Sequence, residues 1–338
     1  MKKKVIAGLL SVAMVASFGM TGCGSGADSA ASKEASASEE TAESEEAEEE
    51  SPEKAETLTF DNYGREITVN GTPEKVLTLG PNCTELFCAL GLNDLVIGNS
   101  LNNHSRGALP EYKEAYNAIP ELNHSSATRE AVQTSGADFI YGLDWEFGDE
   151  GLNTEELEQF GITTYMNAAS TLEEQYQEIR DIGKIFKVED RAEEFVKDQQ
   201  ERIAKVEETV KDQDPVKVLV YDSGNDGVFT CGGTNFETLL IKEAGGKNIF
   251  DDQTEKQWIT VSYEEAIARE PDVILIHDYD SPSVEEKIEE IKSNPVLSQL
   301  DCVKNERFAT IELESVLAGD RMAYTVEKLA ADFYPDLF

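Results

Sequence analysis

Positively charged side chains and histidines are scarce in this sequence. Its 338 residues include 29 Lys and Arg against 68 Asp and Glu, which gives a formal net charge of −39, and only three His. Nucleic-acid binding requires Lys and Arg to neutralise phosphates, so a strongly acidic chain argues against it. Three separated histidines also provide no recognisable ligand set for a bare metal ion.

Sequence signatures of common enzymes are missing as well. The chain has no Gly-x-Ser-x-Gly, no His-Glu-x-x-His and no Walker motif. Asp222-Ser223-Gly224 has no histidine partner at a recognisable spacing. We therefore expect neither an enzyme nor a resident cofactor. A surface-anchored hydrolase and an adhesion or structural lipoprotein are the alternatives from other functional classes.

Only the start of the chain contains a long apolar run. Lysines at positions 2–4 precede an apolar stretch over 5–18, and a Thr-Gly-Cys sequence ends at Cys23. A basic start, a short apolar stretch and small residues before a break are typical of a secretory signal. The cysteine resembles that of a bacterial lipobox, so we predict a lipoprotein signal peptide over 1–22 and a lipid (palmitate) on Cys23. The alternative is an ordinary secreted protein with an incidental cysteine.

Aromatic residues are absent from the segment that follows. Residues 24–56 contain mainly Gly, Ala, Ser and Glu, and the stretch from Glu34 to Glu50 has nine glutamates without Lys or Arg. Such a segment buries too little apolar surface to offset the entropy lost on ordering, and its charges repel one another. We predict that residues 23–56 form a disordered acidic tether between the lipid and the folded part.

Cysteines are few. Besides Cys23 the chain has Cys83, Cys88, Cys231 and Cys302. An even number outside the cytoplasm permits disulfides, but the spacing matches no zinc site. Small buried thiols are an equally good interpretation.

Beyond residue 57, short apolar segments alternate with helical patterns. A hairpin is expected over 58–69, and buried strands are expected over 75–79, 94–97, 139–141, 161–166, 216–221, 273–277 and 308–311. Between 170 and 212, apolar residues recur at helical spacing with one break, which indicates two helices or one long kinked helix. We predict an α/β protein with an N-terminal lobe (57–169), a connecting helix (170–212) and a C-terminal lobe (213–338). Each lobe would hold a mostly parallel sheet with flanking helices, as in Rossmann-like folds.

A short internal repeat relates the two lobes. Residues 128–140 and 262–274 each place a glutamate, Glu130 or Glu264, eight residues before an aspartate that opens a strand. This spacing puts the glutamate in the first turn of a helix, where the helix dipole favours a carboxylate. Helix capping could explain both residues. The functional alternative is an exposed acid at an equivalent place on each lobe.

Four segments resemble the periplasmic binding protein family for iron–siderophore complexes, haem and cobalamin. They are Pro81–Gly91, Phe229–Thr234, Glu243–Phe250 and Trp258–Glu264. The resemblance covers residues 57–338 and implies two α/β lobes bridged by one long helix, the class III fold. It also implies delivery of a ligand to an ABC importer, with Glu130 and Glu264 docking onto arginines of the permease.

Candidate ligand-binding residues follow predicted strands, because parallel sheets bind ligands beyond the carboxyl ends of their strands. Aromatic faces suit flat ligands, although core packing is the alternative for each ring. Asn82 and Thr84 could donate hydrogen bonds or cap a helix that begins at Thr84. The full set of candidates is Asn82, Thr84, His104, His124, Tyr141, Trp145, Phe229, Trp258, His277 and Arg321.

Charged candidates point to the chemistry of the ligand. A histidine could contact iron or haem directly, although an ordinary polar role is the alternative for His104, His124 and His277. The resemblance places an aromatic residue at the position of His124 in cobalamin-binding members, which disfavours a corrinoid. Arg106, Arg129 and Arg321 could pair with an anionic siderophore or with surface carboxylates.

Together these patterns predict a monomeric, lipid-anchored receptor on the extracytoplasmic face of the cell membrane. Its expected ligand is an iron chelate (a ferric siderophore), with haem or a corrinoid such as cobalamin as alternatives. Its expected partners are the permease and, through it, the ATPase of an ABC transporter.

Overall fold

The computed structural model describes residues 56–148, 150–224 and 226–338. The predicted signal peptide, Cys23 and nearly all of the acidic tether lie outside these residues. All elements below belong to one compact unit, Glu53–Phe338. Within the described residues no helix combines the length and apolar character needed to cross a membrane.

A five-stranded parallel sheet forms the centre of the N-lobe (57–169). Its order is β5-β4-β3-β6-β7. The strands are β3 (Val76–Leu79), β4 (Val96–Ser100), β5 (Glu121–Asn123), β6 (Phe139–Leu143) and β7 (Thr163–Asn167). The helices are α1 (Pro81–Ala89), α2 (Lys113–Ala118), α3 (Arg129–Thr134) and α4 (Thr154–Gln159).

Both faces of this sheet are buried, because successive side chains of a strand point to opposite sides. Phe139 and Tyr141 pack in the same apolar cluster as Phe87 of α1. Ile140, between them, packs instead with Val132 of α3 and Leu157 of α4. The central strand β6 is therefore buried along its whole length rather than at alternate residues.

The C-lobe (213–338) repeats this plan with four parallel strands in the order β11-β8-β13-β14. They are β8 (Val216–Tyr221), β11 (Gly246–Asn248), β13 (Val273–Asp278) and β14 (Phe308–Glu312). The helices are α7 (Phe236–Glu243), α8 (Tyr263–Ala268), α9 (Val284–Ser293), α10 (Asp301–Lys304) and α11 (Met322–Phe333).

Two smaller antiparallel sheets are attached to the lobes. In the N-lobe, β1 (Thr57–Asn62) and β2 (Arg65–Asn70) form a hairpin whose turn residues, Tyr63 and Gly64, have φ of 57° and 80°. In the C-lobe, β9 (Ser223–Gly224), β10 (Val228–Cys231) and β12 (Trp258–Val261) pair in the order β12-β10-β9. This second sheet positions aromatic residues of the site described below.

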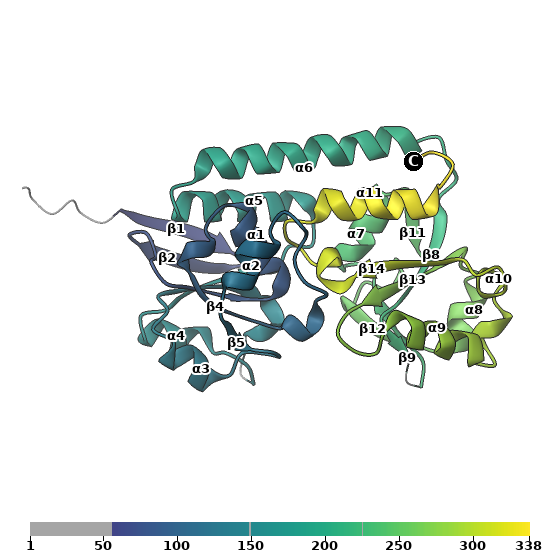
Figure 1. Ribbon diagram of the computed structural model, residues 1–338, viewed down its shortest axis with the longest axis horizontal. Coiled ribbons are helices and arrows are strands. Elements are labelled where there is room, and N and C mark those ends of the chain that lie inside the picture. The colour runs from purple at the N-terminus through teal and green to yellow at the C-terminus, as the bar shows by residue number, and fades with distance from the viewer. Residues whose placement is uncertain (1–55, 149, 225) are drawn as a thin grey trace, which may run out of the picture. The chain divides into compact units, whose positions relative to one another are not determined.

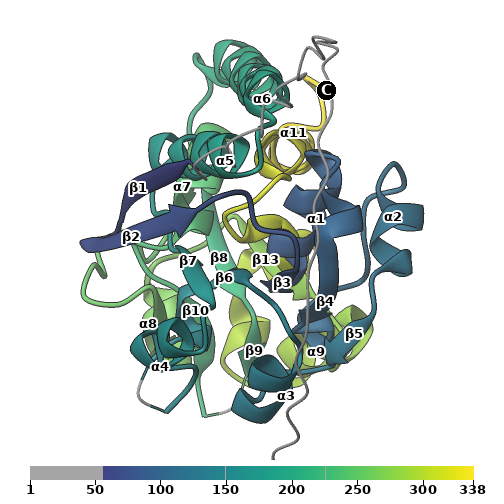
Figure 2. The same cartoon turned by 90° about the vertical axis from the view of Figure 1, so that its left-hand side faces the viewer.

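One long helix bridges the lobes. Between them the chain forms α5 (Leu172–Ile185) and α6 (Glu189–Val210). The 22 residues of α6 extend about 33 Å at the usual rise per residue. Figure 1 and Figure 2 both show α6 lying across α5 on the N-lobe side and α11 on the C-lobe side.

Side chains on one face of α6 explain this position. Val196, Ile203, Val206 and Val210 are buried at helical spacing, whereas most of the other residues are charged and exposed. Ion pairs add to this packing, as between Arg180 of α5 and Glu193 (2.7 Å). The fold is therefore the two-lobed α/β arrangement with one bridging helix that the sequence predicts.

Several boundaries differ from the sequence-based expectation by one or two residues, as where β7 begins at Thr163 rather than at 161, and two elements differ by more. The first helix begins at Pro81 rather than Thr84, because proline is well tolerated in a first turn and Gly80 (φ 141°) turns the chain just before it. The second strand runs from Val96 to Ser100 rather than over 94–97, since Asn93–Leu95 form a 3₁₀ turn.

The four cysteines of the described residues are free, buried thiols: Cys83, Cys88, Cys231 and Cys302. Burial raises the pKa of each thiol, and raises that of Cys88 to about 12. Of the two interpretations left open by their number, the structure supports small apolar core residues.

Candidate functional site

In each of the two parallel sheets there is one point where the chain, after adding strands on one side, continues on the other side. Such switch points open a crevice beyond the carboxyl ends of the strands. In the N-lobe the point lies between β3 and β6, and in the C-lobe between β8 and β13. The carboxyl ends of β6, β8 and β13 are followed by Trp145, Asp222 and Tyr279. All three line one cavity of about 390 Å³.

This inter-lobe cavity has the size of a small-molecule site. From the N-lobe come Asn103, His104 and Trp145. The larger C-lobe contribution is Asp222, Phe229, Trp258, Tyr279, Asp280, Ser281, Leu313 and Leu317.

Aromatic side chains dominate the wall of the cavity. Phe229 of β10 and Trp258 of β12 stack with ring centroids 5.6 Å apart and an interplanar angle of 21°. The pairing of these two strands fixes this contact. From the opposite lobe Trp145 is 45% exposed, which is unusual for so large an apolar ring. Partly exposed rings from both lobes thus leave flat apolar faces for a ligand.

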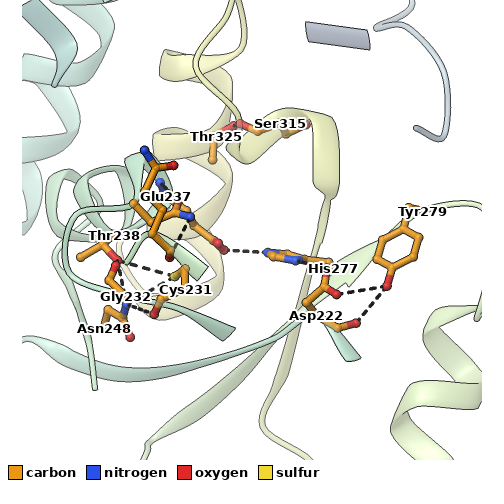
Figure 3. A network of polar contacts seen from close by, with 12 residues as sticks. Asp222, Cys231, Gly232, Glu237, Thr238, Asn248, His277, Tyr279, Ser315 and Thr325 are labelled. Atoms are coloured by element: carbon orange, nitrogen blue, oxygen red, sulfur yellow. Dashed lines mark hydrogen bonds and ion pairs between the residues drawn. The ribbon is translucent and has the colours of Figure 1, made fainter. Parts of the chain in front are cut away.

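A buried ionic network lies behind this wall. Nδ1 of His277 is 3.0 Å from Oδ1 of Asp222, and Nε2 is 2.9 Å from Oε1 of Glu237. Figure 3 shows the imidazole between the two carboxylates, with the hydroxyl of Tyr279 turned toward Asp222. Because both ring nitrogens face carboxylates, both donate, and the ring is an imidazolium.

The electrostatics of the network agree with this geometry. Burial alone would lower the pKa of His277, but the charge of Glu237 and the hydrogen bonds to Asp222 and Glu237 raise it to about 9. Burial would likewise raise the pKa of Asp222, but His277 holds it below its usual range. Asp222 therefore remains a carboxylate at the floor of the cavity.

A second set of hydrogen bonds fixes the loop after β10. Asn248 Nδ2 donates to the Cys231 carbonyl (3.0 Å) and to Thr238 Oγ1 (2.7 Å), and Thr238 in turn donates to the Gly232 carbonyl (2.8 Å). Gly233 lies so close to Asp251 that an added Cβ would be 2.0 Å from its carbonyl oxygen. The glycine-rich segment 229–234 and the segment 243–250 thus act together to hold β10.

The three histidines have separate environments. His104 lines the cavity, and burial lowers its pKa, so it is neutral at pH 7. His124 is exposed on the N-lobe, where Nδ1 is 3.2 Å from Glu121 and Nε2 is 3.6 Å from Asp280 of the C-lobe. His277 is buried beneath Trp258, whose ring centroid is 5.9 Å away. Among the described residues, no cluster of three His, Cys, Asp or Glu could hold a metal ion.

The arginines are held in ion pairs or by the backbone, and none of them lines the cavity. Arg106 Nε pairs with Asp278 Oδ1 across the lobes at 2.7 Å. Arg129 Nε donates to the Gly151 carbonyl at 2.7 Å. Arg321 is buried between Glu85 of α1 (Nε–Oε1 3.1 Å) and Glu314. Arg321 thereby joins the two lobes beneath the cavity.

Three further candidates are buried away from the cavity. Asn82 donates to Asn167 Oδ1 (3.1 Å) and, across the lobes, to the Ala318 carbonyl (2.7 Å). Thr84 Oγ1 donates to the Gly80 carbonyl at 2.8 Å. Tyr141 donates to Glu178 at 2.7 Å. The donor groups of all three are used inside the protein, and none of the three lines the cavity.

Sequence reasoning missed most of the polar lining. Asp222 was considered only as part of a hydrolase motif, and Tyr279, Asp280 and Asn103 were not considered. The available signal was position, because Asp222, Tyr279 and Asp280 directly follow β8 and β13. Leu313 and Leu317 come from a 3₁₀ turn at Leu313–Val316 and the residue after it, and no sequence pattern marks them.

The paired glutamates occupy equivalent positions. Glu130 lies in the first turn of α3 and Glu264 in the first turn of α8, and both are exposed. The cap bonds come from neighbouring residues: Thr128 accepts from Ala131 N (3.2 Å) and Ser262 from Glu265 N (3.1 Å). The helix ends are therefore capped by hydroxyl groups rather than by the glutamates.

Comparison with known sequences and structures is consistent with this architecture. The sequence model of the family described as "Periplasmic binding protein" matches residues 76–313. An "Uncharacterized ABC transporter substrate-binding lipoprotein YvrC" of Bacillus subtilis is 25% identical, over 100% of this chain and 99% of that protein. A "Vitamin B12-binding protein" of Vibrio campbellii is 26% identical over 61% of this chain and 71% of its own.

A solved structure extends the likeness to three dimensions. The crystal structure of a periplasmic binding protein from Veillonella parvula superposes with a TM-score of 0.74 at 26% identity. The match covers 82% of this chain and 98% of that one.

Proposed function

Because the chain belongs to the periplasmic binding protein family and is a substrate-binding protein of an ABC transporter, we propose a specific ligand for it. We propose that it captures a ferric siderophore and delivers it to the permease of its transporter. The observation that carries the proposal is the inter-lobe cavity with aromatic faces from both lobes. A chelate presents flat or amphipathic organic groups to such faces, whereas a bare ion requires a converging set of ligating side chains.

Intrinsic fluorescence tests this proposal directly, because the chain has two tryptophans and both line the cavity. Titration of the purified unit from residue 57 with a ferric trihydroxamate should quench the emission saturably at micromolar concentrations. Trp145→Phe and Trp258→Phe variants would assign the response to each lobe. If ferric trihydroxamates, haem and corrinoids all leave the emission unchanged, the proposal is wrong.

A corrinoid is the second candidate ligand. It is favoured by the relative named a vitamin B12-binding protein, which shares 26% identity with this chain. The exposed His124 does not line the cavity, so its difference from an aromatic residue does not disfavour a corrinoid at this site. Cobalamin in the same titration distinguishes the two ligands.

Delivery to the permease would use Glu130 and Glu264. Their exposure at equivalent first turns, one on each lobe, leaves two carboxylates available for basic partners. Replacing both with alanine should abolish uptake in cells while the affinity for ligand stays unchanged. Glu155 and Glu285 are matched controls, since each is an exposed glutamate in a first turn of the same two lobes. Unchanged uptake in the Glu130/Glu264 variant would remove the docking role.

A lipid anchor at Cys23 would keep the receptor near its permease. The support is the lipobox-like sequence that ends at Cys23 and the relative named a lipoprotein. Tethering raises the effective concentration of the receptor at the membrane. Cys23→Ala should move the protein from the membrane fraction to the soluble or secreted fraction. Retention of this variant in membranes would contradict the anchor.

A further inference from the structure

Charge distribution in the inter-lobe cavity is one-sided. Of the lining residues that the structure describes, Asp222 and Asp280 are carboxylates and none is Lys or Arg. Among these described lining residues, His104 carries the one titratable nitrogen, and burial lowers its pKa so that the ring is neutral. A ligand in this cavity therefore meets carboxylate oxygens and aromatic faces.

The cations near the cavity are turned away from it. Lys287 is fully buried: its ammonium group donates to the His277 carbonyl (2.7 Å) and lies 3.6 Å from the Tyr279 ring centroid. Arg106 is held by Asp278 outside the lining. The imidazolium of His277 is covered by Trp258 and contacts the cavity only through Asp222.

The Asp222 carboxylate is held in place before any ligand binds. Oδ1 faces Nδ1 of His277 at 3.0 Å, and Oδ2 accepts a hydrogen bond from the Tyr279 hydroxyl at 3.2 Å. These partners fix its orientation, so little entropy is lost when it pairs with a ligand. Aromatic faces beside a carboxylate also attract cations through their quadrupoles, as in sites for quaternary ammonium groups.

From this arrangement we infer that the cavity selects chelates that carry a positive charge, and that Asp222 is the residue that makes the selection. The inference rests on the proposed function and narrows it. Chelates whose outer surface carries carboxylates are disfavoured, because the wall offers no cation to pair with them and Asp222 repels them. Uncharged chelates are intermediate.

A charge series on one scaffold tests the inference without altering the protein. The probes are a linear ferric trihydroxamate with a free terminal ammonium group, its N-acetylated form and its N-succinylated form, which are cationic, neutral and anionic. Haem, with its propionates, is a second anionic probe, and cobalamin a corrinoid probe. Tryptophan fluorescence should show the cationic form binding about tenfold or more tightly than the anionic form, given the usual strength of a charge-assisted hydrogen bond.

Asp222→Asn then identifies the residue responsible. This variant keeps the shape of the side chain, with an oxygen that can accept from His277 and an amide group that can donate to the Tyr279 hydroxyl. It should reduce the preference for the cationic probe about tenfold. The matched control is Asp301→Asn, which removes the same charge from an exposed side chain on α10 outside the cavity. The control should keep the preference. If Asp222→Asn fails to fold, Asp280→Asn tests the assignment by elimination, because it removes the other carboxylate of the lining and should keep the preference for the cationic probe. Loss of the preference in Asp280→Asn would show that Asp222 is not the selecting residue.

The possible outcomes separate the two proposals. Equal or tighter binding of the anionic trihydroxamate, haem as the tightest ligand, or an unaltered preference in Asp222→Asn would overturn the charge selection and leave the receptor function standing. If only corrinoids bind, the diaqua and dicyano forms of cobinamide, whose net charges differ, make the same comparison. Absence of any response to all probes would overturn the receptor function and the selection together.

Discussion

The two lobes share an architecture, but their buried carboxylates are stabilised by different partners. On the N-lobe side, Glu178 of α5 accepts hydrogen bonds from Tyr63, from Tyr141 (2.7 Å) and from Asn167 Nδ2 (2.8 Å), all of them neutral donors. In the C-lobe, Asp222 and Glu237 share the cation His277. Burial raises the pKa of Glu178, whereas His277 holds that of Asp222 below its usual range.

This difference assigns the lobes different parts in binding. The buried N-lobe carboxylate stabilises the packing of α5 on the sheet and does not line the cavity. The charged C-lobe network has one end in the cavity, at Asp222, beside Phe229, Trp258 and Tyr279. We therefore expect the C-lobe to set ligand specificity and the N-lobe, through Trp145 and His104, to cover the bound ligand.

Of the contacts between the lobes, the buried ion pair of Arg321 with Glu85 should have the largest effect on stability when it is removed. Arg321 is 3% exposed and lies between Glu85 and Glu314 from the two lobes. Removing one member of a buried ion pair leaves an uncompensated charge and typically costs about 3–5 kcal/mol. Arg321→Met should lower the free energy of unfolding in urea by this amount. Arg180→Met, which breaks a more exposed pair with Glu193, should cost less than about 1 kcal/mol. Equal losses in both variants would contradict the role of Arg321.

The two buried networks should respond differently to pH. The pKa of His277 is raised from 6.5 to about 9, so its contribution to stability is complete below pH 6.5 and is lost as the pH rises through 9. Relative to His277→Gln, the unaltered protein should lose on the order of 3 kcal/mol of unfolding free energy over this range. Urea denaturation between pH 6 and about pH 9.5 measures the slope.

Glu178→Gln is the matched N-lobe control for this slope. The Glu178 side chain accepts hydrogen bonds from neutral donors, and no cation beside it titrates over that range. The variant should therefore keep the dependence of the unfolding free energy on alkaline pH that the unaltered protein shows. A parallel pH profile in His277→Gln and the unaltered protein would show that His277 is not an imidazolium in the folded state.

Sequence patterns were sufficient for the architecture because it depends on many residues at once. The buried strands and the helical stripe of α6 are each encoded by several apolar side chains, so errors at single residues do not matter. The family resemblance drew on segments whose structural role is now visible, as in the close approach of Gly233 to Asp251. The ends of single elements, such as the start of α1 at Pro81, depend on one or two residues and were less predictable.

The site depended on pairs of residues that are distant in the chain. Whether Arg321 points into the cavity or pairs with Glu85, 236 residues away, depends on the long-range contact that brings the start of α11 beside Glu85 of α1. His277 likewise lies near the carboxyl end of a buried strand, as a ligand-binding residue would, but Asp222 and Glu237 enclose it. The aromatic candidates were predicted more successfully. Trp145 lies in a 3₁₀ turn, and Phe229 and Trp258 lie on the small antiparallel sheet, where none of the three rings is fully buried.

Truncating each tryptophan in turn compares how much the two lobes contribute to the free energy of ligand binding. Trp258 packs against Phe229 and lies over His277, whereas Trp145 is 45% exposed without a bound ligand. Truncating a well-packed aromatic residue at the centre of a site typically lowers the binding free energy by about 2 kcal/mol or more, and truncating a peripheral one lowers it by about 1 kcal/mol. Trp258→Ala should therefore weaken ligand binding more than Trp145→Ala in isothermal titration calorimetry. A larger loss for Trp145→Ala would place the main binding surface on the N-lobe.

The smallest effect is expected at the rim, where exposed charges bridge the lobes. Arg106 pairs with Asp278, and His124 lies near Asp280. The hydrogen bonds of His124 with Glu121 and with Asp280 raise its pKa. Because exposed ion pairs contribute little and are screened by salt, the Arg106→Met/His124→Gln variant should lose less than about threefold in ligand affinity at 0.15 M salt. At ~1 M salt the variant and the unaltered protein should bind alike. A loss of more than about tenfold in the variant would mean that the rim controls closure of the lobes. The division between a selecting C-lobe and a covering N-lobe would then have to include the contacts between them.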